Sequence, residues 1–288
     1  MGSEKNQKQK DLLKQIKKEI TKIRTYVPKV AIFGDTGVGK SSLCNALFGK
    51  DIAKISDVEA CTREPQEIFI SGKKGKGGIN LIDVPGVGED PSRHQEYLNL
   101  YKNLLPEIDL ILWAIKADDR KYASAIDVYK KILEPNLKNC PVIFVITQVD
   151  KIEPYREWDI ENSKPSINQQ NNIDKKIIDI SKVFNVSTEY IIPISASEKY
   201  NLVELVNKVV EVLPNEKKSS FVREAKEENI SEKAVEESEK GLWDHITETF
   251  GDVIESVKNT VVDIIEETAP KIVKNVISSV KSFISSWW

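Results

Sequence analysis

The sequence lacks the features of a disulfide-rich or membrane-spanning protein. Its three cysteines, Cys44, Cys61 and Cys140, lie far apart and form no metal-binding or redox pattern, which favours free thiols in a reducing cytosol. It has no run of about 18 apolar residues, the length that a transmembrane helix needs, and its N-terminus is too polar for a signal peptide. We therefore expect a cytoplasmic protein without a membrane-spanning segment.

A strong net charge is also lacking, because 42 basic and 45 acidic residues leave a formal charge of −3. No RNA-binding module or broad basic patch is recognisable either, so no nucleic-acid partner is expected. The charge is nevertheless uneven. Residues 4–24 carry eight basic and three acidic side chains, a balance of +5, and residues 241–269 carry one lysine and seven acids, a balance of −6.

The hydrophobic pattern divides the chain into four segments, and no internal repeat is found. Apolar residues at helical spacing predict an N-terminal amphipathic helix over residues 1–28, which ends at Pro28. Short apolar runs alternate with helical stretches over residues 29–214, the texture of an α/β domain. A charged helical connector is expected over 215–240, with its charges on a solvated face, and an amphipathic helical region over 241–288.

Six apolar runs are the expected strands, at 30–33, 67–71, 79–82, 109–115, 142–147 and 190–194. Four of them are nearly continuous in apolar residues, as strands covered by helices on both faces should be. The glycine-rich SGKKGKGG suits a hairpin turn between the second and third runs. Helices are expected near 40–48, 94–105, 121–133, 168–184 and 201–212, and Trp113, inside a strand, is expected in the core.

The first expected strand runs into GDTGVGKS, which fits the phosphate-loop pattern G-x-x-x-x-G-K-[ST] and opens a helix. In such a loop the glycines let backbone amides turn towards phosphates, the lysine reaches the β- and γ-phosphates, and the serine hydroxyl binds Mg²⁺. The residues expected to contact the nucleotide here are Gly34, Asp35, Thr36, Gly37, Val38, Gly39, Lys40, Ser41 and Ser42.

Two further fragments are suited to the phosphate end of a nucleotide. The third run ends in DVPG, where Asp83 can hold a Mg²⁺-bound water and Gly86 can offer its N–H to the γ-phosphate. Thr62, between the phosphate loop and the second run, is placed where a mobile threonine can close on Mg²⁺ and the γ-phosphate. The expected metal ligands are therefore Ser41, Thr62 and Asp83, and the residues expected to assist catalysis are Lys40, Thr62 and Gly86.

Two later fragments are suited to a guanine base. The fifth run ends in TQVD, Thr147–Asp150, whose terminal carboxylate can accept two hydrogen bonds from the guanine ring. Gln148 belongs to the same contact surface. The sixth run ends in SAS, where Ser195 and the backbone N–H of Ala196 can meet the guanine O6. Each of these fragments lies at or near a strand end, and ligands of open α/β sheets bind at the carboxyl ends of the strands.

GDTGVGKS, Thr62, DVPG, TQVD and SAS together resemble the five motifs of the Ras-like GTPases, over about residues 29–213. The Era-like branch is the most similar, and DVPGVGE, LILWAIKADDR and TQVDKIEPYREWD look like the bacterial YfjP-type GTPases. A kinship with immunity-related and dynamin-like GTPases stays open. The resemblance implies a six-stranded mixed sheet, GTP or GDP with Mg²⁺, GTP hydrolysis, and switch segments near 52–64 and 85–96.

Three positions depart from the pattern of these GTPases. Gln148 replaces the usual lysine that stacks on the base, so guanine specificity is expected with lower affinity. Val87 replaces the water-orienting glutamine of Ras, so hydrolysis should be slow without an activator or self-assembly. Gly37 replaces the asparagine of the potassium-activated enzymes, so potassium activation is not expected. The candidates for orienting the water are Glu89, Arg93 and His94.

The C-terminal segment raises a separate question. A helix over 271–288 has an apolar stripe that ends at Trp287 and a polar face with three lysines, five serines and no acid. It can pack with residues 242–268 or with the N-terminal helix as a lobe, contact a membrane peripherally through 270–288, or bind a partner. A nucleotide-dependent homodimer is one such partner. The expected function is a GTP-hydrolysing switch coupled to this lobe. The alternatives are a GTP-binding module with negligible turnover and a dynamin-like membrane remodeller.

Overall fold

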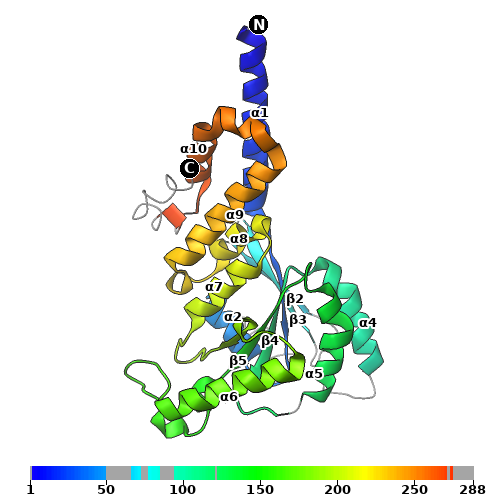
Figure 1. Cartoon of the computed structure of the whole chain (residues 1–288), viewed down its shortest axis with the longest axis vertical. Coiled ribbons are helices and arrows are strands. Elements are labelled where there is room, and N and C mark those ends of the chain that lie inside the picture. Colours follow the sequence, from blue (N-terminus) through cyan, green and yellow to red (C-terminus); the bar gives the residue numbers. More distant parts are fainter. Residues whose placement is uncertain are drawn as a thin grey trace.

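The computed structural model describes residues 2–49, 66–72, 77–84, 94–120, 122–270 and 273–274 of the 288-residue chain. Fifteen helices and strands make up most of this part (Figure 1). In chain order they are α1 (Gly2–Thr25), β1 (Lys29–Phe33), α2 (Lys40–Phe48), β2 (Gln66–Ser71), β3 (Gly78–Asp83), α4 (His94–Leu104), β4 (Leu110–Lys116), α5 (Ala123–Val128), β5 (Val142–Thr147), α6 (Ile167–Phe184), β6 (Ile191–Pro193), α7 (Leu202–Val212), α8 (Asn215–Glu224), α9 (Glu232–Phe250) and α10 (Lys258–Thr268).

The strands form one six-stranded sheet in the order β2-β3-β1-β4-β5-β6. β2 runs antiparallel to β3, and every other neighbouring pair is parallel. β1 therefore lies between β3 and β4, with Ile32 opposite Asp83 and Phe33 opposite Trp113. The predicted α/β fold with a six-stranded mixed sheet is confirmed, and the carboxyl ends of the five parallel strands meet at one edge.

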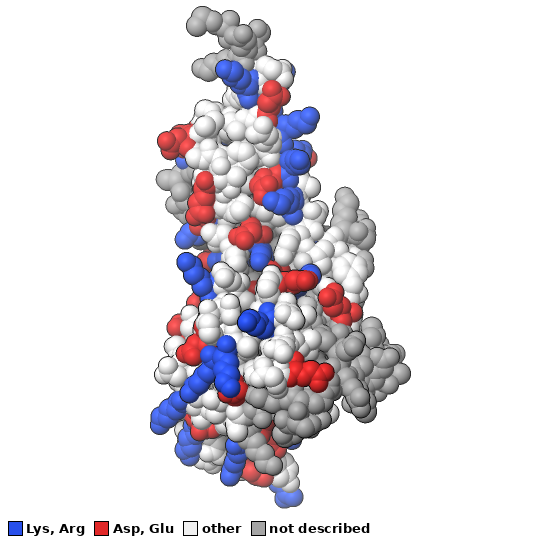
Figure 2. Space-filling view, turned by 90° about the vertical axis from the view of Figure 1, so that its right-hand side faces the viewer, with Lys and Arg blue, Asp and Glu red and all other residues white. Residues whose placement is uncertain are grey.

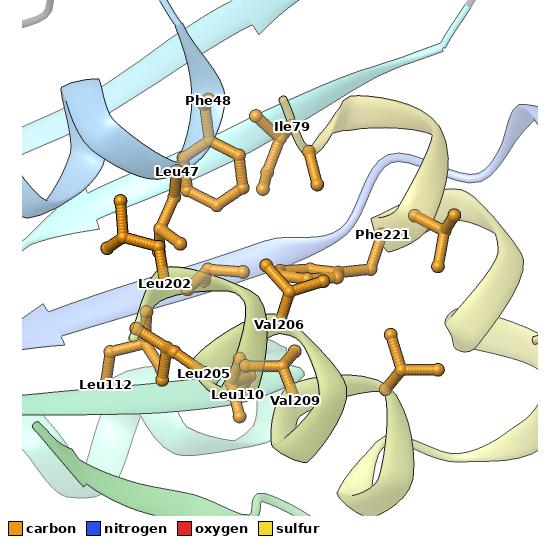
Figure 3. Close-up of a cluster of buried hydrophobic side chains, with 14 of the residues drawn as sticks. Leu47, Phe48, Ile79, Leu110, Leu112, Leu202, Leu205, Val206, Val209 and Phe221 are labelled. Atoms are coloured by element: carbon orange, nitrogen blue, oxygen red, sulfur yellow. The ribbon is translucent and has the colours of Figure 1, made fainter. Parts of the chain in front are cut away.

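Helices cover both faces of the sheet, which explains why the central strands are apolar throughout. On one face α4, α5 and α6 cover an aromatic group in which Trp113 contacts Phe144 and Phe184 at ring separations of 5.7 and 5.8 Å. Trp113 is 2% exposed, so its predicted place in the core is confirmed. On the other face α2 and α7 pack together with α8 around Phe221 (Figure 3).

The connector over 215–240 is more deeply buried than its charges suggested. Phe221 and Ser220 on α8 are fully buried, and so is Ser238 on α9. Glu239 is 2% exposed. The expectation of a solvated charged face holds for five exposed residues, Glu227, Glu228, Glu232, Lys233 and Lys240, and was wrong for Lys218 and Glu239, which are buried. The physical reason is that serine needs little space and that the buried charges find partners, as Lys218 does in Glu237.

A helical lobe of α1, α9 and α10 extends from one end of the sheet (Figure 1). Its core joins Ile16, Ile20 and Ile23 of α1 to a run of apolar residues from the C-terminal helices: Leu242, Ile246, Ile254, Val257, Val261 and Ile265. Residues 242–265 thus pack with the N-terminal helix, one of the arrangements that the sequence left open, and most of residues 271–288 lie outside the described residues. The pairing also brings the acidic segment beside the basic one, as in the Lys17–Glu267 contact of 3.8 Å.

The C-terminal part of the lobe is divided by a turn at Gly251. The apolar stripe that follows Leu242 is not one helix, because the chain turns at Gly251, where φ is 61° and ψ is −152°.

No helix within the described part combines the length and hydropathy that crossing a bilayer requires. Figure 2 shows acidic and basic side chains interspersed over one face, without a broad basic patch among the described residues there. Phe283 and Trp287 lie outside the described residues.

Candidate nucleotide-binding site

The loop between β1 and α2 is shaped by glycines with left-handed backbone angles. Gly34, Gly37 and Gly39 have φ values of 140°, 83° and 93°. A Cβ atom at Gly34 would lie 2.4 Å from the carbonyl oxygen of Ala114, so only glycine lets the loop pass this close to β4. A Cβ atom at Gly37 would meet nothing within 4 Å in the described structure. Among the described residues, nothing therefore fills the space beside the middle of the loop, where a phosphate can sit.

Lys40 and Ser41 occupy the first turn of α2, at the positive end of the helix dipole. Gly39, at the N-cap, has no side chain to cap the N–H groups of this turn. Lys40 Nζ donates to the carbonyl oxygens of Gly34 at 2.8 Å and Asp35 at 3.4 Å, so its ammonium lies over the loop. This arrangement can hold an anion with both backbone amides and a side-chain charge.

The end of β3 lies beside the phosphate loop. Asp83 is opposite Ile32 in the parallel ladder, and Val84 N donates to Ile32 O at 3.4 Å. Asp83 thus ends the strand next to β1, the strand that leads into the phosphate loop. The side chain of Asp83 is outside the described part. Ser41 and Asp83 offer hydroxyl and carboxylate oxygens, the donor atoms that Mg²⁺ prefers, so the residue types here fit this ion.

Other predicted residues of the phosphate end are not described. Thr62 and Gly86 lie outside the described residues, as do Val87, Glu89 and Arg93. His94 begins α4, but its side chain also falls outside the description. Their roles remain predictions.

The TQVD segment at the end of β5 is tied to the phosphate loop. Thr147 is 2% exposed, and its Oγ1 donates to Val38 O at 2.6 Å. Gln148 has a left-handed backbone with φ 58°, and its Nε2 donates to Gly37 O at 3.3 Å. Because both bonds cross from β5 to the loop, the segment expected to read the base has a fixed position relative to the segment expected to hold the phosphates.

The side chain of Asp150 is suited to a ligand that donates hydrogen bonds. Its Oδ1 atom is buried and has no hydrogen-bond partner among the described residues. A buried carboxylate oxygen without a donor is costly, and such atoms are usually paired in folded proteins. The N–H groups at one edge of a guanine ring are suitable donors for this oxygen. The structure thus leaves Asp150 poised for the interaction expected from the sequence.

The SAS segment lies next to TQVD. Val149 N donates to Ile194 O at 3.3 Å, which links the segments after β5 and β6. Ser195 is fully buried, and its Oγ accepts a hydrogen bond from Glu198 N at 3.2 Å. This bond holds the turn that contains Ala196. The expected base-binding segments therefore converge at one edge of the sheet.

One residue near the site was missed from the sequence. Lys151 directly follows TQVD, and its Nζ donates to Gln148 Oε1 at 3.2 Å. The only sequence signal was its position next to the motif. Trp158 lies further along this loop; it is 9% exposed and contacts Tyr200 at a ring separation of 5.5 Å, so it anchors the loop.

Comparison with known proteins points to one family. A family model described as a 50S ribosome-binding GTPase matches residues 29–148. The chain is 39% identical over 204 residues to the uncharacterized protein YkfA of Escherichia coli, covering 71% of this chain and 68% of YkfA. It is 33% identical over 274 residues to the uncharacterized protein YfjP of E. coli, covering 95% of this chain and 91% of YfjP.

A solved structure is similar as well. Era in complex with MgGDPNP and nucleotides 1506–1542 of 16S ribosomal RNA is 30% identical, with a TM-score of 0.46. The match covers 65% of this chain and 57% of the Era chain. The chain thus spans little more than half the length of Era.

Proposed function

Since this chain belongs to the Era-like P-loop GTPase family and contains a GTP-binding GTPase domain, we propose that it hydrolyses GTP to GDP and phosphate with Mg²⁺ and that the bound nucleotide controls its helical lobe. The observation that carries the proposal is the unpartnered oxygen of Asp150 at the sheet edge that also holds the phosphate loop. A guanine base and a phosphate chain satisfy both features at once.

Each part of the nucleotide has assigned residues in this proposal. Asp150 accepts hydrogen bonds from the base, and the turn around Ala196 meets its O6. The amides around Gly37 and the ammonium of Lys40 hold the phosphates. Their positive charge stabilises the negative charge that develops on the phosphate oxygens during phosphoryl transfer. Ser41 and Asp83, with Thr62, hold Mg²⁺. The ion, when bound, neutralises charge on the β- and γ-phosphate oxygens.

We expect slow hydrolysis in the isolated protein. Val87 follows DVPG and cannot form a hydrogen bond to the attacking water. Glu89, Arg93 and His94 stay candidates for this task, as does a group from an activator or from a second copy of the chain. This position also favours the second candidate function, a GTP-binding module with negligible turnover.

The coupling to the lobe begins at the far end of α2. This helix carries the phosphate loop at its N-terminus, and the segment between α8 and α9 closes its C-terminus. Lys226 N donates to Leu47 O at 2.8 Å, and the buried side chain of Asn229 donates to Ala46 O at 2.8 Å. The ring of Phe221 meets Phe48 edge-on at 5.8 Å (Figure 3). A displacement of α2 is therefore transmitted to α8 and α9.

A second connection runs through Arg223 on α8. Its guanidinium donates to the carbonyl oxygens of Arg24 and Tyr26, at the end of α1, and to Gly78 O at 3.3 Å. Gly78 begins β3, the strand that ends at Asp83. One side chain thus joins the strand expected to reach Mg²⁺ to the first helix of the lobe.

A buried ion pair joins the lobe to these connections. Arg24 on α1 donates to both carboxylate oxygens of Glu239 on α9, at 2.6 and 2.5 Å, and to Ser219 on α8 at 2.5 Å. Because three helices share this cluster, α1 and α9 follow α8 when it moves. Within the proposal, residues 270–288 are the segment that this movement presents to a membrane surface or to a second copy of the chain, in the cytoplasm.

Multiple-turnover GTP hydrolysis, measured across protein concentrations with and without liposomes, tests the proposal. We expect phosphate release that requires Mg²⁺, is lost in Lys40→Met and is retained in Lys182→Met, an exposed lysine on α6 that serves as control. If the wild type released phosphate no faster than Lys40→Met under any of these conditions, the proposed GTPase activity would be rejected. Retained GTP binding would then favour the binding module.

A further inference from the structure

A chain of two hydrogen bonds runs from Lys151 to the phosphate loop. Lys151 Nζ donates to Gln148 Oε1 at 3.2 Å, and Gln148 Nε2 donates to Gly37 O at 3.3 Å. A Cβ atom at Gly39 would lie 3.6 Å from the same Nε2. The amide of Gln148 is thus held between a lysine on one side and the loop on the other.

The local backbone explains why these residues meet. Gln148 has φ 58° and ψ 37°, and it precedes a short 3₁₀ turn, Val149–Lys151. Lys151 N donates to Gln148 O at 3.0 Å, which closes this turn and sets the two side chains side by side. Lys151 is exposed, and no carboxylate pairs with it in the described part of the chain. Among the described side chains, its ammonium therefore donates a hydrogen bond to that of Gln148.

The chemistry of the two groups gives the contact a direction. A glutamine amide has an acceptor end and a donor end, and either can face the loop when the side chain turns over. An ammonium only donates, so Lys151 pairs with the oxygen and leaves the NH₂ group to face Gly37 O. The reversed amide would place two oxygens against each other at the loop, a repulsive contact.

We propose that Lys151 is a positioning residue for guanine nucleotides, because it fixes the amide of Gln148 against the phosphate loop. The amide of Gln148 and the ammonium of Lys151 together form the hydrogen-bonded link to Gly37 O. The inference deepens the proposed function and rests on it, since it concerns the same nucleotide site. It assigns a role to a residue outside TQVD.

The test measures the release rate of a fluorescent GDP analogue from the full chain. Lys151→Met removes the donor at similar length, and we expect release to be about three- to tenfold faster, as for the loss of one ordinary, solvent-exposed hydrogen bond. Lys151→Arg should restore the wild-type rate. Lys182→Met, the exposed lysine on α6, should leave the rate unchanged. The melting temperature without nucleotide should be the same in all four proteins, which separates positioning from a general loss of stability.

A second background decides whether Lys151 acts through Gln148. Gln148→Met offers Lys151 no amide oxygen, so adding Lys151→Met to it should change the release rate less than twofold. An equal effect of Lys151→Met in both backgrounds, or no effect in the wild-type background, would overturn the inference and leave GTP binding intact. Failure of the wild type to bind the GDP analogue would reject the proposed function together with the inference.

Discussion

Replacing Arg24 with methionine is expected to destabilise the protein strongly, because it leaves a buried carboxylate without its partner. The side chains of Arg24 and Glu239 are 6% and 3% exposed. The guanidinium satisfies both carboxylate oxygens, at 2.6 and 2.5 Å, and also donates to Ser219. Methionine fills much of the same volume but donates no hydrogen bond, so the Glu239 carboxyl group would lose its charged partner in a nearly dry environment.

The size of the effect follows from the burial of the pair. Removing one partner of a buried ion pair costs about 3–5 kcal/mol, whereas replacing both partners with apolar side chains is often about neutral. We therefore expect Arg24→Met to lower the free energy of unfolding by about 3–5 kcal/mol. The double variant Arg24→Met/Glu239→Leu should recover most of this loss.

Urea unfolding at pH 7, followed by circular dichroism, measures both quantities. Lys22→Met is the matched control, because Lys22 lies on the same helix and pairs with Glu19 at 3.0 Å but is 75% exposed. Its removal should cost less than about 1 kcal/mol. A similarly small loss in Arg24→Met, or a double variant no more stable than the single one, would refute the account of how the lobe is held.

Two further predictions concern the core and the thiols. Phe221→Ala should lower the free energy of unfolding by about 3–5 kcal/mol in the same assay, because the ring is fully buried against Phe48; a loss under about 1 kcal/mol would contradict the packing of α8 on α2. Burial raises the pKa of the Cys140 thiol to about 12, so the reactive thiolate is scarce at pH 8 and forms only as the pH approaches that value. Timed alkylation and mass spectrometry should find Cys140 labelled far more slowly in the native than in the denatured protein; equal rates would contradict its burial.

The sheet and the positions of the nucleotide-binding segments at its edge could be predicted because both depend on local sequence patterns. A continuous apolar run fits a strand covered on both faces, as in Val142–Thr147. Apart from Thr62, the expected nucleotide-binding segments each follow a strand that is paired in parallel, so the pairing brings their ends to one edge.

The connector and the lobe could not be predicted from the same patterns. Ser219 and Glu239 are polar, and only their contacts with Arg24, 195 and 215 residues away in the chain, explain their burial. The role of Gly251 was also hidden, since the apolar spacing continues across the turn. Burial of a polar residue depends on partners that a local window does not contain.

The contact between Lys151 and Gln148 illustrates the same limit at the site. The two residues are three positions apart, yet the left-handed backbone of Gln148 decides that they meet. Neither residue type indicates that conformation.

The base selectivity of Asp150→Asn tests the central claim most directly. The Asp150 carboxylate should accept two hydrogen bonds from guanine, so Asp150→Asn should weaken GDP binding by about 100-fold or more. Xanthine carries an oxygen where guanine carries its amino group, so the same variant should gain affinity for xanthosine diphosphate. Asp252→Asn, on the exposed surface of the lobe, serves as control. A competition assay with a fluorescent nucleotide measures all three proteins. We predict that Asp150→Asn prefers xanthosine diphosphate, whereas the wild type and Asp252→Asn prefer GDP. An unchanged preference for GDP in Asp150→Asn would contradict the account.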